Sequence, residues 1–168
     1  WGCRSRLARC GGVVLVNGPT ANNNGALDHS GFKITGGTLI AVGSAGMAQA
    51  PDTTSTQYSL MVNLTAAQAA GTLVHIATDG GREVLTFRPT KAYQSIVVSS
   101  PELKSGSTYV VHVGGSSTGA AVDGVYSGGA YSAGTQVASL TLSGVVTVSG
   151  ATRGFGVPGA GAPPPGRR

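Results

Sequence analysis

Residues 11–18 read GGVVLVNG and residues 36–43 read GGTLIAVG, so one pattern returns after 25 residues. Each copy consists of a glycine pair, a run of mostly apolar residues and a closing glycine. Repeats of about 20–30 residues with short strands are typical of a parallel β-helix, in which apolar strand faces stack and glycines allow the corners. The pattern therefore predicts that residues 13–46 are stacked coils. Two unrelated strands flanked by glycine are the alternative.

The chain after residue 46 has a different pattern. Turn signals about ten residues apart separate short apolar runs, and this spacing is typical of an antiparallel sandwich. The triplet Asp79-Gly80-Gly81 predicts a hairpin, whereas the alanine-rich residues 65–71 predict one turn of helix at most. We expect residues 47–150 to form an antiparallel β-sandwich-like unit that caps the coils. The predicted strands are 57–64, 72–77, 83–88, 95–99, 108–113, 137–142 and 145–148.

The composition favours this all-β interpretation, because the chain has 28 glycines and only 10% charged residues. The net charge of +5 comes from the two ends, since residues 13–150 hold five basic and six acidic residues. We therefore expect no nucleic-acid partner. No apolar run reaches the roughly 18 residues of a membrane helix. Residues 1–12, an unstructured or adventitious start that contains Cys3 and Cys10, and the Gly/Pro/Arg tail at 151–168 are predicted to lack structure.

Tyrosines are the candidates for binding a sugar, because a flat apolar ring can stack on a pyranose. Tyr126 and Tyr131 flank a Ser-Gly-Gly turn, where they need not belong to the core. Tyr93 stands at the start of a predicted strand. We predict that these three residues bind carbohydrate. Tyrosines that plug the end of a sandwich are the alternative.

Oxygen-bearing side chains gather between the two copies of the repeat. Asn17, Asn24 and Asp28 are the predicted calcium ligands, and Asn22 and Asn23 add further oxygens. Calcium prefers such hard oxygen ligands. An asparagine-rich turn or an asparagine ladder within the solenoid is the alternative, because only one of these residues is a carboxylate.

The sequence offers little for catalysis. His75 and His112 alternate with apolar residues and should point away from the core, so we expect solvated histidines. No phosphate loop or zinc-protease motif occurs. We therefore predict a protein that is not an enzyme.

Strings such as 43–51 (GSAGMAQAP) and 114–119 (GGSSTG) occur in fixed order and spacing. Together they resemble a group of bacterial surface proteins called carbohydrate-binding domain-containing proteins. The resemblance covers about residues 13–148 and implies a right-handed parallel β-helix similar to that of polysaccharide lyases. It also implies calcium, plant-type polysaccharide as partner, and a place outside the cell or on the bacterial surface. Family members tend to carry a second acid after Asp28, where this chain has Ser30. The matching strings include 43–51 (GSAGMAQAP), 71–76 (GTLVHI), 93–97 (YQSIV), 99–104 (SSPELK) and 114–119 (GGSSTG).

Three functional hypotheses follow from these patterns. The leading one is non-catalytic binding of polysaccharide. The second is a calcium-dependent lyase acting on uronate polymers, with Lys33 or Arg88 in the site. The third is a structural adhesin or stalk module.

Overall fold

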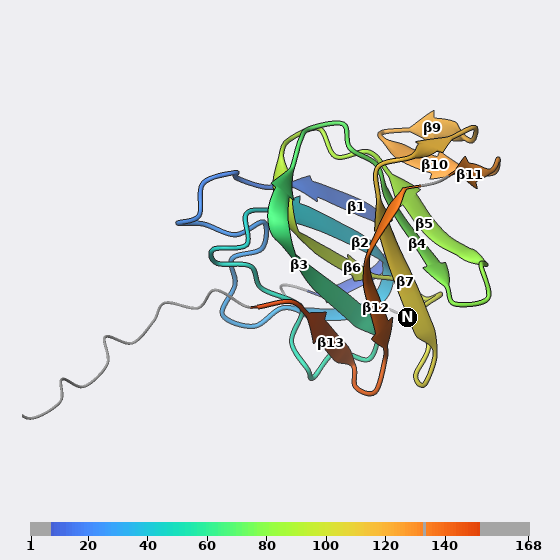
Figure 1. Cartoon of the computed structure of the whole chain (residues 1–168). Helices are drawn as coiled ribbons and strands as arrows, with labels where there is room; N and C mark the ends of the chain where they lie inside the picture. Colours follow the sequence, from blue (N-terminus) through green and yellow to red (C-terminus); the bar gives the residue numbers. More distant parts are fainter. Residues whose placement is uncertain (1–7, 133, 152–168) are drawn as a thin grey trace, which may run out of the picture.

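The strands form two large sheets and one short ribbon (Figure 1). The computed structural model describes residues 8–132 and 134–151. Because these residues form strands and turns, the all-β prediction is confirmed. Sheet A has the order β1 (Ala8–Asn17), β2 (Lys33–Gly43), β6 (Tyr93–Ser99), β3 (Ser59–Gln68) and β13 (Val146–Ser149). Sheet B has the order β12 (Thr135–Thr141), β7 (Thr108–Val113), β4 (Val74–Thr78), β5 (Glu83–Phe87), β10 (Val125–Ser127) and β9 (Ala120–Val122). The ribbon pairs β11 (Tyr131–Ser132) with β8 (Ser116–Ser117).

β1 and β2 are parallel neighbours, and their register follows the sequence repeat. Val13 lies opposite Thr38 and Asn17 lies opposite Val42, so each pair is 25 residues apart. The parallel pairing that the repeat predicts is therefore confirmed. A β-helix is not shown by the described residues, because the other edge of β2 pairs antiparallel with β6.

The main core lies between the two sheets. Ile40, Leu60 and Ile96 of sheet A meet Phe87 and Tyr109 of sheet B, and all five side chains are buried. Burial of large apolar side chains is the dominant stabilising contribution in such a sandwich. Figure 1 shows the two sheets layered against each other. The sandwich-like arrangement predicted for the C-terminal unit is compatible with this packing.

Sheet A is buried on its second face as well. Successive residues of a strand point to opposite faces, so Ala41, Met61 and Val97 turn away from sheet B and form a smaller apolar cluster. Two loop regions cover this cluster, residues 18–32 after β1 and residues 44–58 after β2, and we call them the return segments. They contribute the packed side chains Ala26, Leu27, Ala48 and Ala50, and Val16 at the end of β1 packs beside them.

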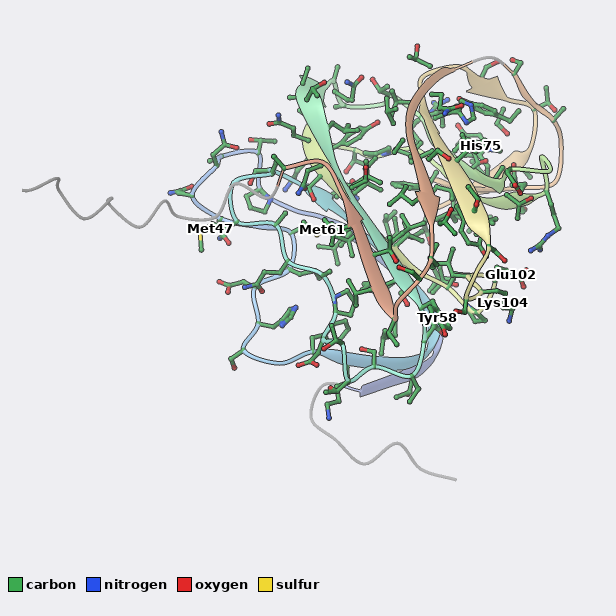
Figure 2. All side chains as sticks on the ribbon, turned by 60° about the horizontal axis from the view of Figure 1, so that its bottom comes forward. Met47, Tyr58, Met61, His75, Glu102 and Lys104 are labelled. Atoms are coloured by element: carbon green, nitrogen blue, oxygen red, sulfur yellow. The ribbon has the colours of Figure 1, made fainter. Side chains whose placement is uncertain are left out.

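The two return segments lie beside each other along much of their length. The Ser44 N–H donates to the Pro19 carbonyl at 2.9 Å, and the Asp52 N–H donates to the Phe32 carbonyl at 2.7 Å. Met47 marks the return-segment side of the molecule in Figure 2, and His75 lies on the opposite side. The 25-residue repeat thus stacks its connections as well as its strands.

Sheet B is antiparallel throughout, as predicted for the C-terminal unit. The expected hairpin joins β4 to β5, with the Thr78 N–H donating to the Arg82 carbonyl at 2.9 Å and Gly81 at a φ of +83°. Sheet A is mixed instead, because β13 runs parallel to β3. Sheet A also joins strands from both sides of the boundary predicted after residue 46.

Two local predictions differ from the structure. The helical turn expected at residues 65–71 is wrong, because β3 continues to Gln68, which lies opposite Tyr93 of β6. Tertiary pairing overrides the helix preference of alanine here. β1 begins at Ala8, inside the segment expected to be unstructured. The predictions for residues 1–7 and 152–168 lie outside the described residues.

None of the described residues belongs to a helix with the length and hydropathy needed to cross a membrane.

Candidate functional site

Five side chains form a row across the outer face of sheet B, and we call it the outer row. Pairing places Gln136 opposite His112, His112 opposite His75, His75 opposite Thr86 and Thr86 opposite Tyr126. Directly opposite residues in an antiparallel sheet share a face. The residues before and after each histidine belong to the main core, so the outer row faces away from it.

Residues 115–132 fold back over part of the outer row (Figure 1). The Tyr131 ring, on β11, stacks on the His75 ring with centroids 3.9 Å apart and planes 7° apart. The Tyr131 hydroxyl donates to the carbonyl of Gly114, the residue directly after β7, at 2.9 Å and so ties the cover to the end of that strand. Burial raises the pKa of Tyr131, and a hydrogen bond from the Gly134 backbone partly opposes this shift. Because of this cover, His75 is only 8% exposed.

A hydrogen-bonded chain fixes the tautomer of His75. The Thr86 hydroxyl donates to Glu83 Oε2 at 2.8 Å, and His75 Nδ1 lies 2.7 Å from the same hydroxyl oxygen. An ionised carboxylate can only accept, so the hydroxyl proton belongs to that bond. The Thr86 oxygen must then accept from His75, which places the ring proton on Nδ1. In the neutral ring, Nε2 is left with its lone pair.

The neutral form of His75 is favoured by its surroundings. Burial lowers the pKa of His75 below its ordinary value, and the nearby His112 lowers it further. Glu83, whose Oε2 lies 3.5 Å from His75 Nδ1, acts in the opposite direction. Burial is the largest of these effects. His75 can therefore accept a hydrogen bond or a proton at Nε2 near neutral pH.

His112 is the second histidine of the site. Its ring centroid lies 6.0 Å from that of His75 and 6.2 Å from that of Tyr131. His112 Nδ1 is buried and has no hydrogen-bond partner within the described part of the chain. A buried nitrogen without a partner is costly, so a bound group that supplied a partner to this atom would be favoured.

These groups line a cavity of about 360 Å³ on the outer face of sheet B. Ala77 and Val110 provide apolar contacts, and Asp79 brings a carboxylate from the hairpin turn. The histidines come from strands in the middle of sheet B and Gln136 from its edge, so a rigid scaffold positions them. The remaining lining residues are His75, Thr78, Gly81, His112, Tyr131, Gly134 and Gln136.

The structure separates the three tyrosines predicted to bind sugar. Tyr131 lines the cavity. Tyr126 belongs to the outer row, where the Arg88 guanidinium carbon lies 5.5 Å from the centre of its ring. Tyr93 is only 2% exposed, and its hydroxyl donates to the Thr72 carbonyl at 3.2 Å. Burial raises the pKa of Tyr93, with a smaller contribution from Tyr131. The Tyr93 ring therefore offers no exposed stacking face in this structure, and carbohydrate binding by Tyr93 stays a prediction from the sequence.

The structure shows one side-chain contact and one backbone contact among the predicted calcium ligands. Asn17 Oδ1 accepts a hydrogen bond from the Thr90 N–H at 2.9 Å, and the Asn24 carbonyl accepts from the Ser44 hydroxyl at 2.5 Å. Asp28 is exposed. Within residues 8–132 and 134–151, no three His, Cys, Asp or Glu residues gather as a metal group. Calcium takes about six to eight oxygens, so these residues do not by themselves form a calcium cage. Calcium binding stays a prediction from the sequence.

The sequence interpretation missed the two histidines as a site. Their outward direction was predicted correctly from the strand alternation, but the expectation that they are solvated is wrong for His75. The alternation identifies the face of a sheet on which a residue lies, and it does not reveal that a distant loop covers that face. The available signal was the matching place of each histidine in its strand, between two apolar residues.

A second hollow differs in chemistry from the histidine cavity. It is a mostly apolar groove of about 510 Å³ between β1, at the edge of sheet A, and β9 and β10, at the edge of sheet B. Val13 and Val122 stand in it with 62% and 69% exposure. Asp123 and Ser127 are the polar residues that line it, so the groove offers few hydrogen-bonding groups to a polar ligand.

Comparisons of the chain with protein-family models, curated proteins and solved structures found no match. The resemblance to carbohydrate-binding surface proteins therefore stays a prediction from the sequence strings. The function is inferred from the geometry of the site.

Proposed function

We propose that this chain is a non-catalytic carbohydrate-binding unit of an extracellular or bacterial cell-surface protein, with plant-type polysaccharide as its ligand. One observation carries the proposal: the cavity on the outer face of sheet B combines an aromatic ring with convergent polar side chains. Ligand sites are commonly concave, partly apolar and about 300–1,000 Å³ in size. The cavity of about 360 Å³ has room for one or two sugar rings.

The chemistry of the lining suits a sugar. Tyr131 has one ring face against His75, so its other face or its edge contacts the ligand. His75 Nε2 accepts a hydrogen bond from a sugar hydroxyl, and Asp79 accepts others. Gln136 is exposed and both donates and accepts. A sugar hydroxyl also donates and accepts, so each polar group in the cavity has a matching partner.

The same proposal includes the finer fold, in which β1 and β2 are the last coils of a right-handed parallel β-helix and the sandwich is its cap. The parallel register and the stacked return segments support this view. The end of a solenoid exposes strand edges and apolar side chains, which must be covered. The antiparallel pairing of β6 with β2 provides such a cover. Calcium bound near Asp28, Asn24 and Asn17 is a further part of the proposal.

A pull-down on insoluble cellulose and pectin tests the proposed function. We expect the chain to be retained, and we expect Gln136→Ala to weaken retention about three- to tenfold, because it removes one or two hydrogen bonds. Gln136 is exposed and projects from the edge strand of sheet B, so its loss should leave the fold intact.

Gln68→Ala is the matched control, because Gln68 is on β3 and does not line the cavity. It should bind like the unchanged chain. A chelator arm tests whether calcium contributes. Failure of both polysaccharides to retain the chain, or equal binding by both variants, contradicts the proposed site.

A lyase is the second candidate function. The observation that supports it is the neutral His75 ring, because the lone pair on Nε2 can act as a base. Lys33, the base suggested by the sequence, is exposed at the start of β2. Ultraviolet absorbance of an unsaturated product released from pectin would favour the lyase. Glycan arrays that remain blank would favour the structural adhesin or stalk.

A further inference from the structure

We propose that His75 and His112 form a two-histidine site for a divalent transition-metal ion such as Zn²⁺, with water completing the coordination. The two residues lie directly opposite each other on β4 and β7 and share the outer face of sheet B. The metal site does not rest on the proposed function, since it requires only the two rings and no glycan, but the ion would lie in the same cavity and use the same His75 nitrogen, Nε2.

The separation of the rings suits a shared ion. Zinc binds imidazole nitrogen at about 2.0–2.1 Å in tetrahedral geometry, which places the two ring centroids about 5–6 Å apart. The centroids of His75 and His112 are 6.0 Å apart. The observed separation therefore lies at the upper end of the range that a shared ion requires.

The orientation of His75 also suits a metal ligand. Its Nδ1 points to Thr86 on β5, which flanks β4 on the side away from β7. Nδ1 and Nε2 lie on nearly opposite sides of the imidazole ring, so Nε2 is directed away from β5, toward the side on which His112 lies. The Glu83–Thr86–His75 chain resembles the hydrogen bonds that hold zinc-binding histidines, in which the nitrogen that does not bind the metal donates to a carboxylate or another acceptor.

His112 supplies an independent observation. Its Nδ1 is buried without a partner among the described residues, and coordination of an ion is one way to satisfy such a nitrogen. Imidazole nitrogen selects zinc, copper or nickel over calcium, so this site differs from the one predicted at Asp28. Within the described ranges no third His, Cys, Asp or Glu joins a metal group. Water ligands must therefore complete the shell, and the affinity should be modest.

Calorimetric titration with zinc chloride tests the site. The full chain is used with Cys3→Ser and Cys10→Ser, because thiolates bind zinc strongly. We expect one zinc ion per chain near neutral pH and loss of binding near pH 5, where protons displace the metal. His112→Asn should weaken binding at least tenfold. Thr86→Val, which removes the hydroxyl that orients His75, should weaken it about 10–100-fold.

His29→Asn is the matched control, because His29 lies in the first return segment, where its Nε2 is 3.1 Å from the Ala50 carbonyl. The zinc affinity of the His29→Asn variant should equal that of the parent chain without cysteines. Ring-proton NMR of the parent chain gives a second readout that does not depend on whether a variant folds: zinc should shift the His75 and His112 signals and leave those of His29. Equal binding by His112→Asn and His29→Asn, no binding by the parent, or shifts at His29 alone would overturn the proposal.

Discussion

Replacing Gly46 with alanine is expected to lower the free energy of unfolding by about 1–3 kcal/mol. A Cβ atom at residue 46 would overlap the backbone carbonyl of Asn22 in the other return segment. The contact is reciprocal, because a Cβ at Gly25 would overlap the carbonyl oxygen of Met47. The neighbouring bond from the Ser44 N–H to Pro19 limits how far the segments can separate. The added methyl group therefore strains the stack.

Gly80→Ala is the matched control for this prediction. A Cβ at residue 80 meets only the Thr78 hydroxyl, at an ordinary 3.9 Å. Its effect should stay within about 0.5 kcal/mol. Urea denaturation followed by circular dichroism compares the two variants. Equal unfolding midpoints for Gly46→Ala and Gly80→Ala would show that the return segments do not stack as closely as the structure has them.

Truncation of Phe87 to alanine is expected to cost about 3–5 kcal/mol, the range for removing a buried aromatic ring. Phe87 is fully buried, at 0% exposure, in the core between the sheets. It lies on β5, opposite Val74 of β4 and Val125 of β10, so its loss opens a cavity shared by three strands. The total free energy of unfolding of a small domain is about 5–15 kcal/mol, so this variant should lose a large part of its stability.

Val122→Ala provides the comparison, since Val122 is 69% exposed on β9. In the same denaturation experiment, the free energy of unfolding of Val122→Ala should lie within about 0.5 kcal/mol of that of the unchanged chain. If Phe87→Ala were as mild as Val122→Ala, sheets A and B could not enclose the core at this position.

Much of the fold was predictable because its signals are local. The 25-residue repeat predicted stacked strands, and residues 13–17 do pair in parallel with residues 38–42 at that spacing. The Asp79-Gly80-Gly81 turn predicted its hairpin, because such residues tolerate positive φ. These features depend on a few neighbouring residues.

Other features depended on distant partners and could not be predicted. Residues 65–68 belong to β3, which pairs with β6, although alanine favours helix. Tyr93, predicted to bind sugar from the start of a strand, is the first residue of β6 and is buried. The sequence of one strand does not show which distant strand, such as β6 or β13, will pair with it. The mixed pairing of sheet A was missed for the same reason.

The candidate site was predictable in part. Tyr131 was selected as a loop tyrosine free to meet a ligand, and it lines the cavity. The alternation of one strand predicts only that the histidines face outward. It does not show that Tyr131 covers His75 or that Thr86 and Glu83 orient its Nδ1. The site exists only once four strands and a returning loop are assembled.

NMR mapping of an isotope-labelled chain titrated with cello-oligosaccharide and oligogalacturonide tests most directly whether the cavity on sheet B is the ligand site. Our account predicts that the largest chemical-shift changes fall on His75, His112, Tyr131 and Gln136 with at least one of these sugars. Changes centred on the apolar groove at Val13 and Val122, or no change with either sugar, would contradict it.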